Sequence, residues 1–220
     1  MLLLYPNFVQ AHFIWLLPQS SAEGALIHLY FGELAEPDDP ALLDRVAAVK
    51  IWQLDANGKK TALSTSKGDE AIEAVPLIKG VPTVIGAEHN FGVLKRGDSS
   101  FVLQYYAKTF VNTPPEQWGA IDSSRELKLE ILPVKKADSQ FELQVNWQGK
   151  PLENSELKIE DDKGEIEIEG KTDADGKFSF SASPERVLSI RAKHVEETAG
   201  ELDGASYSDI RHYSTLSLKL

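Results

Sequence analysis

The sequence predicts an all-β protein made of two tandem β-sandwich domains of the immunoglobulin-like or transthyretin-like kind. Apolar and polar residues alternate over short segments along almost the whole chain, which is the period of a half-buried strand. Glycine, asparagine and aspartate separate these segments at short intervals, as turns between strands require. With 220 residues, the chain is long enough for one large or two small domains with ordinary hydrophobic cores.

The first part of the chain contains several strand signals and one short helical signal. Asp39-Pro40 predicts a cap and a helical turn over residues 41–45. Asn57-Gly58, between two apolar alternations, is typical of a hairpin turn. Residues 112–124, around Trp118, are expected to form a long surface connection. The expected strands of this part are 24–31, 49–54, 60–64, 71–78, 83–86, 91–95 and 101–110.

A change of pattern near residues 133–138 predicts the boundary between the two domains. Lys135, Lys136 and Asp138 interrupt two apolar alternations at this point. A series of short, regularly spaced strands follows, as an immunoglobulin-like sandwich requires. The sequence therefore predicts domains at residues 12–135 and 136–220. The expected strands of the second are 141–147, 156–160, 165–171, 177–181, 187–194 and 214–220.

The first eleven residues resemble the end of a signal peptide. Residues 1–5 are mostly apolar, and Val9 and Ala11 form an A-x-A-like site for signal peptidase. Cleavage after Ala11 would leave His12 as the first mature residue and would direct the chain to the periplasm or outside the cell. The stretch lacks the basic segment that begins a signal peptide. The alternative, that residues 1–17 form an ordinary apolar first strand, therefore stays open.

Composition excludes several kinds of function. The chain has no cysteine, which excludes disulfides, thiolate catalysis and thiolate metal ligands. Its net charge of −11 argues against a nucleic-acid partner, because binding phosphate requires clustered lysine and arginine. No apolar run approaches the roughly 18 residues of a membrane span, so we expect no membrane insertion of the mature chain.

Motifs of the common enzyme classes are absent from the sequence. It contains no Gly-x-Ser-x-Gly, no His-Glu-x-x-His, no phosphate-binding glycine loop and no dinucleotide fingerprint. Asp173-Ala174-Asp175-Gly176 resembles the start of a calcium loop, but its glycine comes too early and the distal bidentate glutamate is missing. We expect a hairpin turn there, and a protein that is not an enzyme.

The histidines are the strongest candidates for chemistry, because the chain has only five. His194 and His212 each share a strand face with aliphatic residues, where an imidazole needs a carboxylate, a carbonyl or a metal as partner. For either one alone, hydrogen bonding within the protein is the more frequent arrangement. His28 more often fits a core position than a ligand, and His89 is expected to be exposed in a turn before a strand.

Together, these residues predict a site for a divalent transition metal. A mature N-terminal histidine offers its α-amine and its ring to one ion, and other imidazoles or a carboxylate would complete the coordination. Nitrogen and oxygen ligands without cysteine suit nickel, cobalt, copper or zinc. The candidate ligands are His12, His194, His212 and His28, with Glu196 and Glu201 as candidate carboxylate partners.

Segments spread over nearly the entire mature chain carry a family resemblance. They are 11–16, 30–33, 37–40, 90–93, 105–108 and 210–216, among them Tyr30-Phe31-Gly32-Glu33 and Asn90-Phe91-Gly92-Val93. These segments resemble the bacterial family described as domain of unknown function 4198. The resemblance implies an exported protein, a mature chain that begins near His12, and a periplasmic role beside a membrane importer of nickel or cobalt. Many nickel-linked members have His-Ala-His at this point, whereas this chain has Gln10-Ala11-His12 and so lacks one possible ligand.

The second part of the chain carries a different resemblance. Residues 149–152 and 172–178 resemble carboxypeptidase-regulatory-like and collagen-adhesin B-type sandwiches, which are transthyretin-like modules. Such modules are spacers or binding platforms without catalysis. The resemblance keeps an alternative open, in which the chain is a structural or protein- or glycan-interaction module of the cell envelope and its histidines are structural. An exposed aromatic patch around Trp118 or Trp147 would support that alternative.

Overall fold

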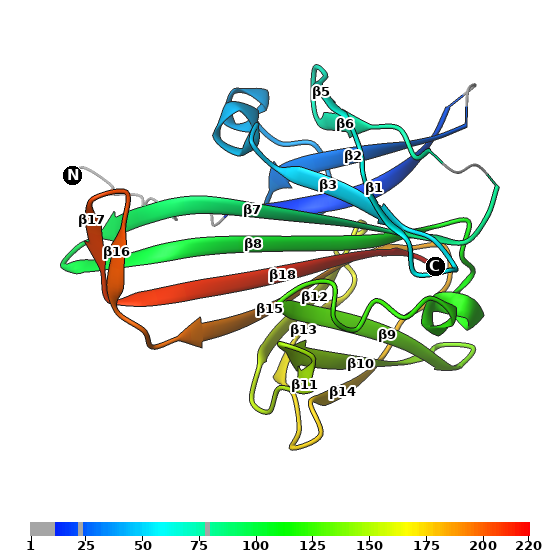
Figure 1. Cartoon of the computed structure of the whole chain (residues 1–220). Helices are drawn as coiled ribbons and strands as arrows, with labels where there is room; N and C mark the ends of the chain where they lie inside the picture. The colour runs from blue at the N-terminus through cyan, green and yellow to red at the C-terminus, as the bar shows by residue number, and fades with distance from the viewer. Residues whose placement is uncertain (1–11, 22–23, 78–79) are drawn as a thin grey trace, which may run out of the picture.

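The computed structural model describes residues 12–21, 24–77 and 80–220. Over these residues the protein is all-β, as predicted, with strands arranged in stacked layers (Figure 1). The predicted signal-peptide remnant, residues 1–11, lies outside the described residues. Of the alternative, in which residues 1–17 form an apolar first strand, only residues 13–17 are seen in a strand, at the start of β1 (Phe13–Ser21), and residues 1–11 remain untested.

The central layer is a long sheet that contains strands from both halves of the sequence. β18 (Asp209–Lys219) runs antiparallel to β15 (Val187–Glu196) and parallel to β8 (Ser99–Val111), so it joins the late strands to the early ones. The strand order of the central sheet is β13 (Glu167–Lys171), β12 (Glu156–Asp161), β15, β18, β8, β7 (Thr83–Arg96), β3 (Lys50–Leu54) and β4 (Lys60–Ala62).

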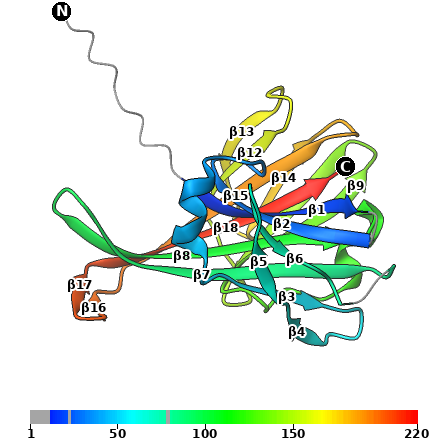
Figure 2. The ribbon, with the colours of Figure 1, turned by 90° about the horizontal axis from the view of Figure 1, so that it is seen from above.

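Smaller sheets cover the two faces of the central sheet, above and below it in Figure 1. The upper sheet has the order β1 (Phe13–Ser21), β2 (Gly24–Gly32), β6 (Ile72–Ala74) and β5 (Thr65–Lys67). In the lower sheet, β10 (Gln140–Trp147) pairs with β9 (Leu129–Ala137), β14 (Lys177–Ser181) and β11 (Lys150–Pro151). A separate hairpin, β16 (Gly200–Leu202) and β17 (Ala205–Tyr207), lies beside the projecting ends of β7 and β8 (Figure 2).

Each interface between layers has its own hydrophobic core, because side chains alternate between the two faces of every central strand. Tyr105 belongs to the upper core with Ile14 and Leu29. Its neighbour Tyr106 belongs to the lower core with Ile190. The central sheet therefore separates the two cores, and a residue's parity along a central strand decides which core it faces.

The predicted boundary between residues 135 and 136 falls inside β9. This strand pairs with β10 along its length, and the central sheet continues from β18 into β8 across the two predicted domains. Residues 12–135 and 136–220 therefore share one sheet, and their division into two domains stays a hypothesis about folding units.

The early turn signals agree with the structure. Asp39 caps the 3-10 helix η1 (Pro40–Val46), where its side chain accepts a hydrogen bond from the Ala41 amide. Asn57-Gly58 forms the turn between β3 and β4, and Gly58 has a φ of 76°. The turn at Asp173 also forms, but it joins β13 and β14 of different sheets and not two paired strands, as a hairpin would.

One expectation for the first half of the chain was wrong, and another was only partly correct. Residues 83–96 form the single strand β7 with a bulge between Asn90 and Gly92, so His89 lies inside a strand and is only 6% exposed. The connection after β8 contains a 3-10 helix, η2 (Pro115–Ala120), and Trp118 packs into the lower core. In both places a polar or proline-rich sequence is typical of a surface segment, but long-range packing buries a large side chain within it.

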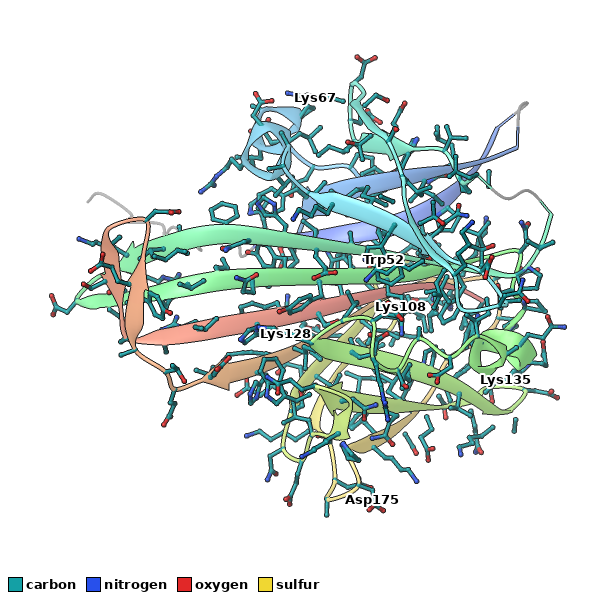
Figure 3. The ribbon with its side chains drawn as sticks, in the orientation of Figure 1. Trp52, Lys67, Lys108, Lys128, Lys135 and Asp175 are labelled. Carbon is teal, nitrogen blue, oxygen red and sulfur yellow. The ribbon has the colours of Figure 1, made fainter. Side chains whose placement is uncertain are left out.

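A buried ion pair, which the sequence analysis does not predict, lies in the lower core. Lys108 of β8 pairs with Glu130 of β9, and both side chains are almost completely buried. The Lys108 ammonium also donates to the Ser123 hydroxyl over 3.2 Å, and the Leu127 amide donates to Glu130 over 3.0 Å. Figure 3 labels Lys108 between the central sheet and the lower strands. The pair fixes the position of β9 against β8.

Candidate functional site

His194 and His212 face each other across the antiparallel pair of β15 and β18. They are direct register partners, and their ring centroids lie 6.2 Å apart. Both side chains lie on the face of their strand that is directed to the lower core, as the aliphatic residues on the same face predict. The sequence therefore placed both side chains on the correct face, and the register brings them together at one end of that core.

Two aromatic residues enclose this histidine pair. The Trp147 ring, at the end of β10, lies 4.4 Å from the His194 ring and 4.5 Å from the His212 ring, measured between centroids. The Tyr106 hydroxyl lies 3.1 Å from His212 Nδ1 and forms a buried hydrogen bond with it. These contacts fix the orientation of the His212 ring and leave its other nitrogen, Nε2, directed elsewhere.

His212 Nε2 is buried and has no hydrogen-bond partner among the described residues. Glu196 Oε2 lies 3.3 Å from it, within ion-pair distance but outside hydrogen-bond alignment. Glu196 is two residues after His194 on β15, so it lies on the same face of the sheet. The site thus holds two imidazoles and one carboxylate at the edge of the lower core.

Burial keeps the two imidazoles neutral near pH 7. It lowers the pKa of His212 from 6.5 to about 4, although the neighbouring Glu196 carboxylate opposes this change. His194 and Lys128 add smaller effects that also lower the pKa of His212. Burial also lowers the pKa of His194, again against the effect of Glu196. Neutral imidazoles have a free lone pair, which is the form that binds a metal.

The structure does not bring His12 to this pair. His12 lies at the start of β1 on the upper side of the central sheet, with its ring centroid 5.5 Å from that of Phe31. Its Nε2 is 3.4 Å from Asp38 Oδ2, and its carbonyl accepts a hydrogen bond from the Tyr105 hydroxyl. Because the central sheet separates the two cores, His12 and the His194–His212 pair lie on opposite faces.

The remaining candidates are also apart from the pair. His28 Nδ1 is 2.9 Å from the Tyr30 hydroxyl, and its Nε2 is 3.8 Å from Glu73 Oε1. Tyr30 and Glu73 lie on strands of the upper sheet. Glu201 is exposed on the separate hairpin strand β16. Within residues 12–21, 24–77 and 80–220, no three histidine, aspartate or glutamate side chains are grouped closely enough to hold a metal ion.

The aromatic patch that would support an envelope-interaction module does not form at the expected tryptophans. Trp118 is 4% exposed and stacks on Phe110 in the lower core. Trp147 lies against His194 and His212. In the described part of the chain, no helix has the length and apolar character needed to cross a bilayer.

Comparison with known proteins gives one family match. The family model described as "Domain of unknown function (DUF4198)" matches residues 9–196. No curated protein matches the sequence of this chain.

Two solved structures illustrate distant similarities. A biofilm-associated protein BSP domain matches 92% of this chain at 13% identity, with a TM-score of 0.23. A pullulanase from Anoxybacillus sp. LM18-11, complexed with maltotriose, matches 83% at 14% identity, with a TM-score of 0.19. The chain spans 29% and 24% of the lengths of these two solved chains. Such scores support no statement about its function.

Proposed function

The chain belongs to the DUF4198 family, and we propose that it is an exported, non-enzymatic protein that binds a divalent transition metal at His194 and His212. The single observation that carries this proposal is the buried Nε2 of His212, which has no aligned hydrogen bond and lies 3.3 Å from Glu196 Oε2, beside a second neutral imidazole. A buried ring nitrogen without an aligned hydrogen bond is costly, and a metal ion shared with Glu196 would satisfy it.

The distance between the two rings suits a shared ion. Two imidazoles on one ion, each with a metal–nitrogen bond of about 2.1 Å, have centroids roughly 5–6 Å apart. The observed separation is 6.2 Å, so small rotations of both rings are sufficient. The hydrogen bond between Tyr106 and His212 Nδ1 would orient the ring, as partners behind metal ligands commonly do.

As they stand, His194, His212 and Glu196 are not grouped closely enough to hold an ion. After rotation of the side chains, Glu196 would supply a third donor and part of the charge balance. Its Oε2 is already 3.3 Å from His212 Nε2, and its side chain is one-third exposed, so it has room to rotate. Two imidazoles and a carboxylate suit cobalt, nickel, copper and zinc, and intrinsic affinity rises from cobalt through nickel to copper before falling at zinc. Water would fill the other coordination positions, giving an open site suited to transfer to another protein, such as a metal importer.

Calorimetric titration with Ni²⁺, Co²⁺, Cu²⁺ and Zn²⁺ tests this proposal. His194→Gln removes one ligand from a half-buried position, so the fold should survive. We expect it to weaken binding at least about tenfold, since changes even behind metal ligands cost 10–100-fold. Glu196→Gln should weaken binding less. His28→Gln, a histidine of the upper sheet with its own protein contacts, is the matched control and should leave affinity unchanged.

The N-terminus gives a second, independent comparison. Protein beginning at His12 and protein retaining residues 1–11 should bind with equal affinity if His194 and His212 are the ligands. Loss of binding on retaining residues 1–11 would assign the metal to the free amine of His12 instead. Absence of saturable binding by all four ions, or full affinity in His194→Gln, would overturn the proposed site.

A further inference from the structure

We propose that a cavity on the upper face of the central sheet binds the carboxylate group of a small organic anion, with Arg191 as its principal partner. The cavity has a volume of about 560 Å³, within the range of small-molecule sites. It lies on the face opposite His194 and His212, because Arg191 and His194 differ in strand parity on β15. The inference is therefore independent of the metal site.

The cavity lies where the upper sheet leaves part of the central sheet uncovered. Strands β12, β13, β15 and β18 form its floor and walls, and Phe13 at the start of β1 closes one side. The side chains used in the argument are Phe13, Glu156, Glu169, Lys171, Arg191 and Tyr213.

Arg191 is the observation that points to an anion. Its guanidinium is partly buried and lies 4.1 Å above the centroid of the Phe13 ring. No carboxylate oxygen of the described residues lies within the 4.0 Å of an ion pair, whereas Arg186 and Arg211 each have such a partner. Burial lowers the pKa of Arg191, and this effect outweighs the opposing effects of three nearby carboxylates, those of Glu160, Glu33 and Glu169. A partly desolvated cation without a carboxylate in direct contact is unfavourable, and a bound anion would provide that contact.

A second cation in the same cavity has no ion pair. Lys171 of β13 lines the cavity, and no described carboxylate lies within 4.0 Å of its ammonium. Lys193, in contrast, is held by Glu156 at 3.1 Å. The cavity thus offers one guanidinium and one ammonium to a ligand, although the whole chain carries a net charge of −11.

The other lining residues favour a carboxylate over a phosphate. The Arg191 guanidinium is planar and matches the two oxygens of a carboxylate. Glu156 and Glu169 line the same cavity and would repel a second negative charge more strongly than a first. The rings of Phe13 and Tyr213, with centroids 5.0 Å apart, offer an apolar surface to the rest of the ligand. An aromatic or aliphatic monocarboxylate therefore fits better than a phosphate ester.

Nuclear magnetic resonance of the Arg191 side chain in the full-length protein provides the test. The Nε–H signal is followed during titrations with sodium benzoate, sodium acetate and inorganic phosphate at constant ionic strength. We expect a saturable shift with benzoate, a weaker one with acetate, and weaker binding of phosphate than of benzoate. Tighter binding of phosphate would overturn the assignment of a carboxylate, and the absence of any saturable shift would overturn the site.

Variants distinguish specific binding of benzoate at Arg191 from non-specific electrostatic attraction of anions. Binding of benzoate should weaken at least about tenfold in Arg191→Gln, the loss expected for a charge-assisted hydrogen bond. Arg125→Gln changes an exposed arginine outside the cavity and should leave binding unchanged. If Arg191→Gln does not fold, Lys171→Gln, on the exposed side of the cavity, carries the comparison and should weaken binding by a smaller factor. Equal benzoate affinity in the folded variants and in the unchanged protein would contradict the proposal.

Discussion

At the scale of single residues, the protonation of His212 makes the stability of the protein depend on pH. Burial lowers its pKa from 6.5 to about 4, so between these values the unfolded chain binds a proton that the folded chain does not. The contribution of this residue is therefore complete above pH 6.5 and is lost as the pH falls toward 4. We expect a loss on the order of 2–3 kcal/mol in the free energy of unfolding. Urea unfolding at pH 7.5, 6 and 5 measures it.

Two variants test whether His212 causes this pH dependence of the free energy of unfolding. His212→Gln removes the titrating group, so its free energy of unfolding should fall less steeply between pH 7.5 and 5. His28→Gln, in the upper sheet, should keep the slope of the unchanged protein. An identical slope in His212→Gln would show that carboxylates alone control the acid sensitivity.

The sequence predicts which face of a strand a side chain occupies, but not which distant residues it contacts. Alternation along β15 and β18 places His194 and His212 on the apolar side, and antiparallel pairing makes them register partners. It gives no information about which layer His12 joins, since that depends on how β1 stacks over the central sheet. The ion pair of Lys108 with Glu130 was missed for the same reason, because two charged residues far apart in a strand pattern resemble exposed positions.

At the scale of elements, β7 depends on a glycine that lets β3 approach closely. The Trp52 ring packs directly over Gly86, and a β-carbon built on Gly86 would overlap that ring. Trp52 is 4% exposed, and the Lys60 ammonium lies over its ring, 4.1 Å from the centroid, so the ring has little room to move. Gly86→Ala should therefore destabilise the protein by about 1–3 kcal/mol through overpacking. Urea unfolding measures this loss, and near-ultraviolet circular dichroism detects the displaced tryptophan.

A matched control exists in helix η2. A β-carbon on Gly119 would have no atom within 4 Å, and its backbone does not adopt a positive φ. Gly119→Ala should leave stability unchanged or raise it slightly. If both alanine variants have the same stability, close packing of Trp52 on Gly86 is not what requires glycine there.

Elements defined by local alternation were predictable, and elements shaped by distant contacts were not. The strand expected at residues 101–110 corresponds to β8, and the one at 24–31 to β2, because their alternation is continuous. The polar run Glu88-His89-Asn90 suggested a turn inside β7, where the structure has a bulge between Asn90 and Gly92. A bulge and a turn use the same residue types, and only the pairing with β8 distinguishes them.

At the scale of the whole molecule, the parallel pairing of β18 with β8 determines the architecture. The all-β class followed from the sequence, but this pairing joins residues about a hundred positions apart, for example His212 and Gln104. No turn or local pattern specifies such a contact. It places the candidate metal site and the Arg191 cavity on opposite faces of one sheet, although both use residues of β15 and β18.

The position of β9 predicts which part of the chain folds as a unit. A fragment of residues 136–220 lacks most of β9, so β10 loses a partner along its length and the lower core loses Leu129 and Ile131. A fragment of residues 126–220 keeps β9 with Leu129 and Ile131, although it leaves the β18 edge toward β8 unpaired and removes Lys108, Tyr106 and Phe110 of β8 from the lower core. In nuclear magnetic resonance spectra, we therefore expect well-dispersed amide resonances from the longer fragment and poorly dispersed resonances, as in an unfolded chain, from the shorter one. A folded 136–220 fragment would place the boundary at residue 135 after all. If neither fragment folds, β8 is an essential part of the lower unit, and the two halves form a single cooperative domain.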